Sequence, residues 1–200
     1  MGFLLRIVTG TNNIVEFPTM ETLLAFAPFI VYVVIERIAG IMPGLISAAF
    51  VAVALLLRDI ISPNRTVKIL DLGTAILFGG LAAYARFTAA TWSIVAVRLR
   101  VDAGLLLIVL ASIIVRRPFT LQYARESVPR EFWDSSEFVR ANYVITAAWA
   151  GAFAVMVAAD LVMLYVTTLP RWVGIAATVA ALYGAFSFTD WYPKRKKEKV

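Results

Sequence analysis

Apolar residues along the chain fall into long, uninterrupted runs separated by short charged segments. The runs cover about 22–35, 38–57, 69–85, 99–115, 143–166 and 173–188. A helix needs about 20 apolar residues, at about 1.5 Å each, to cross a hydrocarbon core about 30 Å thick. The runs are continuous rather than alternating, and backbone in lipid must satisfy its own hydrogen bonds, so they predict helices and not barrel strands. We therefore expect an all-α integral membrane protein, one domain over 1–200, with a bundle of six transmembrane helices.

Three of these runs contain charges. Asp71 lies near the start of the third run, where an acid interacts favourably with the dipole of a helix N-terminus. Arg98 precedes the fourth run, and Arg100 and Asp102 lie at its start, so the path of residues 86–101 stays open. Asp160 lies inside the fifth run, where an acid costs about 3 kcal/mol on insertion scales. The length and apolar character of that run offset the cost, and we keep it as a span.

Composition agrees with a membrane protein and excludes most enzyme chemistry. The 200 residues are 61% hydrophobic and 16% charged, with mean hydropathy +0.82, against about 45–50% and about 25% in soluble proteins. The chain has no cysteine and no histidine, which removes disulfides, thiolate nucleophiles, imidazole bases and the usual zinc ligands. Phosphate-binding loops and nucleophile-elbow motifs are absent from the sequence as well. We expect no enzyme activity, no cofactor and no metal.

The distribution of basic residues predicts the orientation. Fourteen of the 19 Lys and Arg residues lie in the amino-terminal segment, in 58–68, in 116–140 or in the carboxyl-terminal tail, and the other five are Arg37, Arg86, Arg98, Arg100 and Arg171. Cytoplasmic loops carry the excess of basic residues. We expect both termini on the cytoplasmic side of the membrane.

The two ends of the chain favour contact with lipid. Residues 1–8 are expected to lie on the inner surface as a short amphipathic segment and not to act as a cleavable signal peptide. In the tail WYPKRKKEKV, Pro193 is expected to end the last helix, and five basic residues follow it. Each is worth about 1 kcal/mol against an anionic leaflet, so we expect membrane lipids with anionic headgroups as partners of this tail, and no nucleic acid.

Segment 116–140 predicts one or two interfacial helices on the cytoplasmic side. Leu121, Ala124 and Val128 recur at helical spacing after Pro118, and Asp134 with Glu137 predicts the cap of the next helix. One interpretation is that this segment only anchors the bundle. The other is a polar site for a lipid headgroup or partner protein, formed by Gln122, Tyr123, Arg125 and Glu126.

At this segment the chain resembles the bacterial intracellular septation protein A (YciB) family, or a sister group of uncharacterised inner-membrane proteins. The resemblance rests on FAPFIVYVVIERIAG at 26–40, LFGGLAAYA at 77–85, and the order Arg117-Pro118, Trp133, Arg140, Asn142, Trp149. It implies a polytopic inner-membrane protein of cell-envelope synthesis and septation that works through envelope proteins or lipids. The resemblance carries no functional residues with it.

A second candidate site is an intramembrane charge cluster near the outer side, made of Glu36, Arg98, Arg100, Asp102 and Asp160. Ionisable groups at membrane depth are costly, so they usually pair with one another or line a water-filled path. We expect Asp160 to pair with Arg98 or Arg100. The pair is either a structural salt bridge or part of a path for protons or small solutes, which makes a transporter the alternative function.

Small residues recur every four positions at Gly40, Gly44, Ala48 and Ala52. In lipid, such stripes let helices approach closely. They favour packing inside one chain, with a homodimer as the alternative. Gly79 and Gly80 are expected to form a similar packing notch.

Overall fold

The computed structural model describes residues 24–62, 65–126, 128–166 and 168–197. The amphipathic segment expected at 1–8 and the end of the tail at 198–200 lie outside these residues. The regular structure of the described part is entirely helical, which confirms the all-α prediction there. The helices are α2 (Ala27–Ala39), α3 (Ile41–Ile61), α4 (Ile69–Thr88), α5 (Ile94–Ile114), α6 (Phe119–Arg125), the 3₁₀ helix η1 (Arg130–Phe132), α7 (Ser136–Tyr165) and α8 (Arg171–Lys197).

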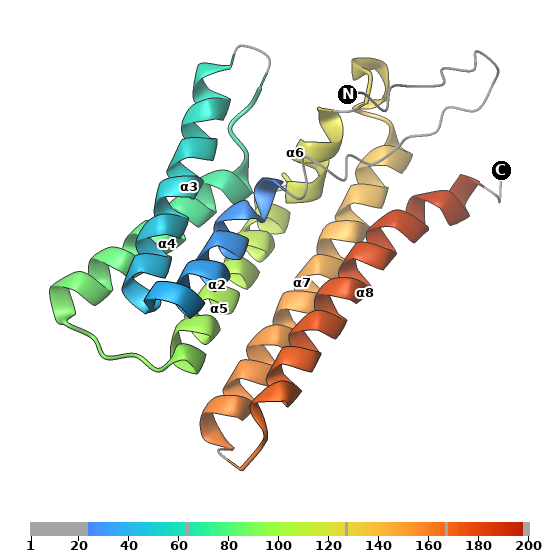
Figure 1. The fold of residues 1–200 in the computed structure, drawn as a ribbon. Helices are drawn as coiled ribbons and strands as arrows, with labels where there is room; N and C mark the ends of the chain where they lie inside the picture. Colours follow the sequence, from blue (N-terminus) through green and yellow to red (C-terminus); the bar gives the residue numbers. More distant parts are fainter. Residues whose placement is uncertain (1–23, 63–64, 127, 167, 198–200) are drawn as a thin grey trace, which may run out of the picture.

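The long helices run alternately in opposite directions, and α5 lies between two groups (Figure 1). On one side α2, α3 and α4 pack in sequence, and on the other α7 packs along α8. The short helix α6 lies at the end of the bundle where α3 ends and α4 begins, and it packs against α7 (Figure 1). The segment between α4 and α5 and the segment between α7 and α8 lie at the opposite end.

Four described helices are long and apolar enough to cross a membrane. They are α3, α4, α7 and the part of α8 from Trp172 to Arg195. Helix α2 has 13 residues, and α5 carries Arg98, Arg100 and Asp102, so neither of these two meets the same measure of length and apolarity. The structure thus has membrane-protein character in four helices.

Several helices extend further than the apolar runs. Helix α5 begins at Ile94, so Arg98, Arg100 and Asp102 lie within its first three turns. Helix α7 begins at Ser136, because the side chain of Ser135 accepts a hydrogen bond from the Phe138 amide and caps the helix. The expected cap, Asp134, is therefore wrong by one residue. Pro193 lies inside α8 and does not end it; a proline removes one helical hydrogen bond, and here the helix continues past that loss.

Trp149 forms the centre of one hydrophobic core. Its side chain is fully buried, stacks on Phe26 at 4.9 Å between ring centroids, and meets Phe186 edge-on at 4.8 Å. Its indole N–H donates to Thr189 Oγ1 at 3.0 Å. Trp149 therefore packs inside the chain, with the polar atom of its ring hydrogen-bonded.

Two glycines let α4 and α5 approach closely. A Cβ atom on Gly104 would lie 2.3 Å from Leu77 Cδ1, and one on Gly73 would lie 2.8 Å from Ile108. The expected notch at 79–80 is wrong, because α4 runs unbroken through both glycines and a Cβ there would meet nothing within 4 Å. In α3, Gly44, Ala48 and Ala52 are buried within the chain, which agrees with packing inside one molecule.

Candidate functional site

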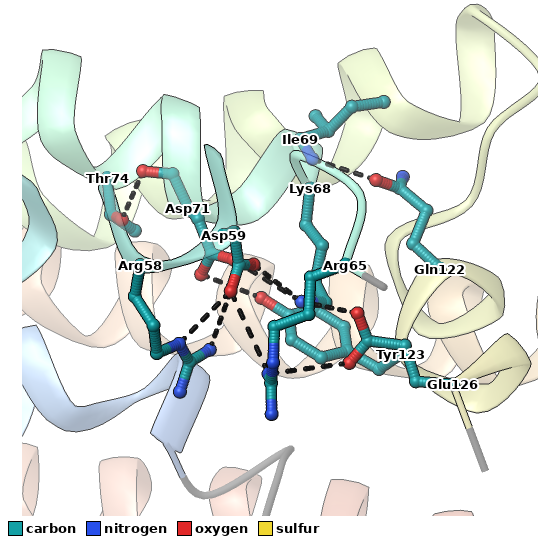
Figure 2. Close-up of polar contacts among 10 residues, drawn as sticks. All are labelled: Arg58, Asp59, Arg65, Lys68, Ile69, Asp71, Thr74, Gln122, Tyr123 and Glu126. Carbon is teal, nitrogen blue, oxygen red and sulfur yellow. Dashed lines mark hydrogen bonds and ion pairs between the residues drawn. The ribbon is translucent and has the colours of Figure 1, made fainter. Parts of the chain in front are cut away.

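Within the described part of the chain, buried charged side chains gather in two places, near opposite ends of the bundle. The first we call the Lys68 cluster; it consists of Arg58, Asp59, Arg65, Lys68, Asp71, Tyr123 and Glu126 and joins α3, α4 and α6 (Figure 2). The second we call the Asp160 cluster; it consists of Tyr32, Glu36, Arg98, Asp102 and Asp160 and joins α2, α5 and α7.

Lys68 is fully buried and has carboxylates on several sides. Its Nζ lies 2.6 Å from Asp59 Oδ2, 2.9 Å from Glu126 Oε1 and 4.0 Å from Asp71 Oδ2. Asp59 is also bound by Arg58 at 2.9 Å and approached by Arg65 at 3.7 Å. A buried charge is tolerated when it is paired and hydrogen-bonded, and each buried charge in this cluster has an oppositely charged neighbour.

Helix α6 brings Glu126 into the Lys68 cluster, because the apolar face of this helix is buried in the bundle. Phe119, Leu121 and Tyr123 are each at most 6% exposed. The Tyr123 hydroxyl donates to Asp71 Oδ1 at 2.9 Å. Burial, and next the nearby charge of Asp71, raise the pKa of the Tyr123 hydroxyl well above its usual value, so the group stays a proton donor.

Gln122, from a distant part of the chain, supplies a hydrogen-bond acceptor to the first turn of α4. Its Oε1 accepts a hydrogen bond from the Ile69 amide at 2.8 Å, and its Nε2 donates to the Arg117 carbonyl at 2.8 Å. The first four amides of a helix have no partner within the helix, and Lys68, which precedes α4, supplies no side-chain cap. Gln122 therefore acts as a cap supplied from α6.

The four residues expected to form a polar cytoplasmic site have contacts within the chain. Gln122, Tyr123 and Glu126 bind α4 and the segment before it, as described above. Arg125 approaches Asp134 at 3.3 Å and stacks near the Trp133 ring at 5.5 Å. The structure thus brings these residues to one end of the bundle, but three of them face inward rather than outward.

In the Asp160 cluster, Arg98 Nη2 lies 2.9 Å from Asp160 Oδ1 and donates to Thr178 Oγ1 at 3.0 Å. Asp160 is 1% exposed and Asp102 7% exposed, and the two carboxyl groups lie close enough to interact electrostatically. Glu36, 8% exposed, lies near the end of α2 with Arg37 at 3.8 Å. The arrangement ties α5 to α7 and α8 by charge and hydrogen bonds.

Arg100 does not join this cluster. Residues two apart in a helix point about 200° apart, so when Arg98 faces Asp160, Arg100 faces away. Its guanidinium lies 4.4 Å from the Trp92 ring centroid and donates to the Ala96 carbonyl. Asp102, four residues after Arg98, shares the inward face.

The Lys68 cluster was not predicted as a unit. The sequence places Lys68 and Asp71 three residues apart at a helix start, which indicated only a favourable interaction with the helix dipole. Tyr123 and Glu126 come from more than 50 residues later, and no local spacing pairs them with α4. Tyr32 was also missed, since its ring belongs to the apolar pattern of 22–35.

Comparisons with protein-family models, with curated proteins and with solved structures find no match for this chain.

Proposed function

We propose that this chain is a bacterial inner-membrane protein with six spans, α2, α3, α4, α5, α7 and α8, and with both termini on the cytoplasmic side. The observation that carries the proposal is the unequal charge at the two ends of the bundle. Arg58, Arg65 and Lys68 lie at the end that also holds α6. Basic residues at 116, 117, 125, 130, 140, 194 and 195 are in or next to α6, η1, the start of α7 and the end of α8, at that same end (Figure 1). An excess of this kind marks the cytoplasmic face.

Helices α2 and α5 complete the six spans in this proposal. The 21 residues of α5 reach about 31 Å, the thickness of the hydrocarbon core. The α5 charges Arg98 and Asp102 face other polar groups of the bundle, which is how charges at membrane depth are usually accommodated.

The absence of cysteine from the sequence gives a direct test of orientation. Thr66, before α4, and Thr91, between α4 and α5, are both exposed and lie at opposite ends of the bundle. We expect a membrane-impermeant maleimide to label Thr91→Cys in spheroplasts, and Thr66→Cys only in inverted vesicles. Labelling of both variants from the same side would refute the six-span arrangement.

As its biological role we propose a non-catalytic one in cell-envelope or septation processes, through contacts with proteins or lipids. The support is the resemblance of 26–40, 77–85 and 117–149 to the septation protein A family, together with exposed charge on η1. Arg130 and Glu131 are exposed and have no part in the Lys68 cluster. A deletion strain complemented with the Arg130→Ala/Glu131→Ala variant should then have altered cell length. Arg86→Ala, an exposed site at the other end, is the matched control; normal cell length with the η1 variant would remove η1 from this role.

The Asp160 cluster supports a second candidate function, transport of an ion or small solute. The observation in its favour is that two acids share one guanidinium at a depth where charge is costly. Flux into proteoliposomes should depend on Asp160. Unchanged flux with Asp160→Asn would count against this candidate.

A further inference from the structure

The Asp160 cluster has more acids than bases. Glu36, Asp102 and Asp160 are all buried. Arg98, from α5, contacts Asp160 at 2.9 Å and interacts electrostatically with Asp102. Arg37, largely exposed, balances Glu36 at 3.8 Å. This leaves Asp102 and Asp160 to share the single guanidinium of Arg98.

Two buried carboxylates that interact electrostatically at this depth do not both remain ionised. Like charges in contact disfavour the second ionisation, and a low-dielectric surrounding strengthens the effect. Arg98 can neutralise one of the two, and its Nη2 contacts Asp160 Oδ1 at 2.9 Å. The carboxyl of Asp102 then carries the uncompensated charge.

An independent feature points to the same place. Tyr32 is 2% exposed, and its hydroxyl has no hydrogen-bond partner within the described part of the chain. The hydroxyl lies within electrostatic range of the charged groups of the cluster. A buried tyrosine hydroxyl normally has a partner, so this one is free to bind a group held between the two acids.

We propose that Asp102 and Asp160 together bind one exchangeable proton. A hydronium ion delivers it and leaves water, one carboxylate becomes a carboxylic acid, and Arg98 stays paired with the other carboxylate. The Tyr32 hydroxyl, which has no hydrogen-bond partner in the described part of the chain, donates a hydrogen bond to the pair once the proton is bound. The charged and titratable groups facing it are Tyr32 and Glu36 from α2, Arg98 from α5 and the two acids themselves; α8 contributes the neutral Thr178.

The geometry favours a proton over a metal ion. No group of three or more Asp or Glu side chains in the described residues is placed to hold a metal ion, and the guanidinium beside Asp160 would repel a cation. Arg98 lies in the second turn of α5 with its side chain 26% exposed, near the outer end of the bundle in the proposed arrangement, and the proton would enter the site from that end. The proposal goes beyond the proposed function, because the proton site stands on the cluster alone, whether or not the chain transports anything.

Infrared spectroscopy of the protein in lipid nanodiscs tests the site. At neutral pH the wild type should show the carbonyl stretch of a protonated carboxylic acid, shifted in D₂O and lost at alkaline pH. The band should vanish in Asp102→Asn and in Asp160→Asn, since either variant leaves one acid that Arg98 holds ionised. Asp134→Asn, altered at an acid whose side chain is 95% exposed, should leave the band unchanged.

Tyr32→Phe gives a test that does not alter the acids. It should keep the band and move its frequency, because a hydrogen bond to the protonated pair is lost. A wild type without the band would overturn the proposal. So would a band that survives both Asp102→Asn and Asp160→Asn, or one that disappears instead in Asp71→Asn of the Lys68 cluster. If the band behaves as expected and proteoliposome flux is absent, the proton site stands and the transport function falls.

Discussion

Removing the buried ammonium group of Lys68 should destabilise the protein far more than removing an exposed one at the same distance from its partner. In Lys68→Met the side-chain length is kept and the charge is lost. Lys68 Nζ lies 2.6 Å from Asp59 and 2.9 Å from Glu126, with Lys68 fully buried. Breaking a buried pair by removing one partner costs about 3–5 kcal/mol, because the other charge stays buried without compensation. Arg58 and Arg65 still contact Asp59, so we expect the lower half of that range.

The chain contains its own control for this experiment. Lys194 Nζ also lies 2.6 Å from a carboxylate, Asp190 Oδ2, but both side chains are at least 70% exposed. Exposed pairs contribute about 0–1 kcal/mol, so Lys194→Met should change the free energy of unfolding by less than about 1 kcal/mol. Both variants would be unfolded by SDS in mixed micelles and followed by helical circular dichroism.

The comparison of the two variants shows whether burial governs the energy of the Lys68 ion pairs. A loss of the same small size for Lys68→Met and Lys194→Met would show that the Lys68 cluster is solvated and that burial does not govern its energy. A double-mutant cycle with Asp59→Asn isolates the pair. We expect the double variant to lose less than the sum of the two single losses, since each single change leaves an unpaired buried group.

Two further predictions concern α4. Tyr123→Phe removes the hydroxyl that donates to Asp71 at 2.9 Å, which should cost about 1–3 kcal/mol because a buried acceptor loses its partner; an unchanged melting temperature would contradict this. Gly104→Ala places a Cβ 2.3 Å from Leu77 and should cost about 1–3 kcal/mol through overpacking. Gly79→Ala, where a Cβ meets nothing, should instead stabilise α4 by up to about 1 kcal/mol through helix propensity; equal melting temperatures for the two glycine variants would refute the close approach of α4 and α5.

The helical class and the apolar runs could be predicted from the sequence because both depend on local pattern. The pairing of Asp160 with an arginine could be predicted too, since a buried acid in lipid needs a base. The sequence did not decide between Arg98 and Arg100. That choice depends on where the helix begins, and the structure of residues 86–101 was left undetermined. Once α5 begins at Ile94, the spacing of Arg98 and Asp102 puts both on one face.

The inward direction of α6 could not be predicted from the sequence. Leu121 and Ala124 mark its apolar face, but an interfacial helix presents the same pattern to lipid that a docked helix presents to protein. What separates the two cases is the long-range contact of Tyr123 and Glu126 with α4, and one sequence taken by itself carries no signal for that contact. The glycine positions show the same limit: Gly79 and Gly80 form the conspicuous pair, while the close approach occurs at Gly73 and Gly104.

The cap that Gln122 gives to α4 bears on the order of events during synthesis. Asp59 and Lys68 are nine residues apart, so their pair can form as soon as the α3–α4 hairpin leaves the ribosome. The amide of Ile69 must wait for Gln122, 53 residues later, and Asp71 for Tyr123, 52 residues later. At about 5–20 residues per second, the hairpin spends about 3–10 s before these partners are made, so water or lipid headgroups satisfy the polar groups of its first turn until α6 is made.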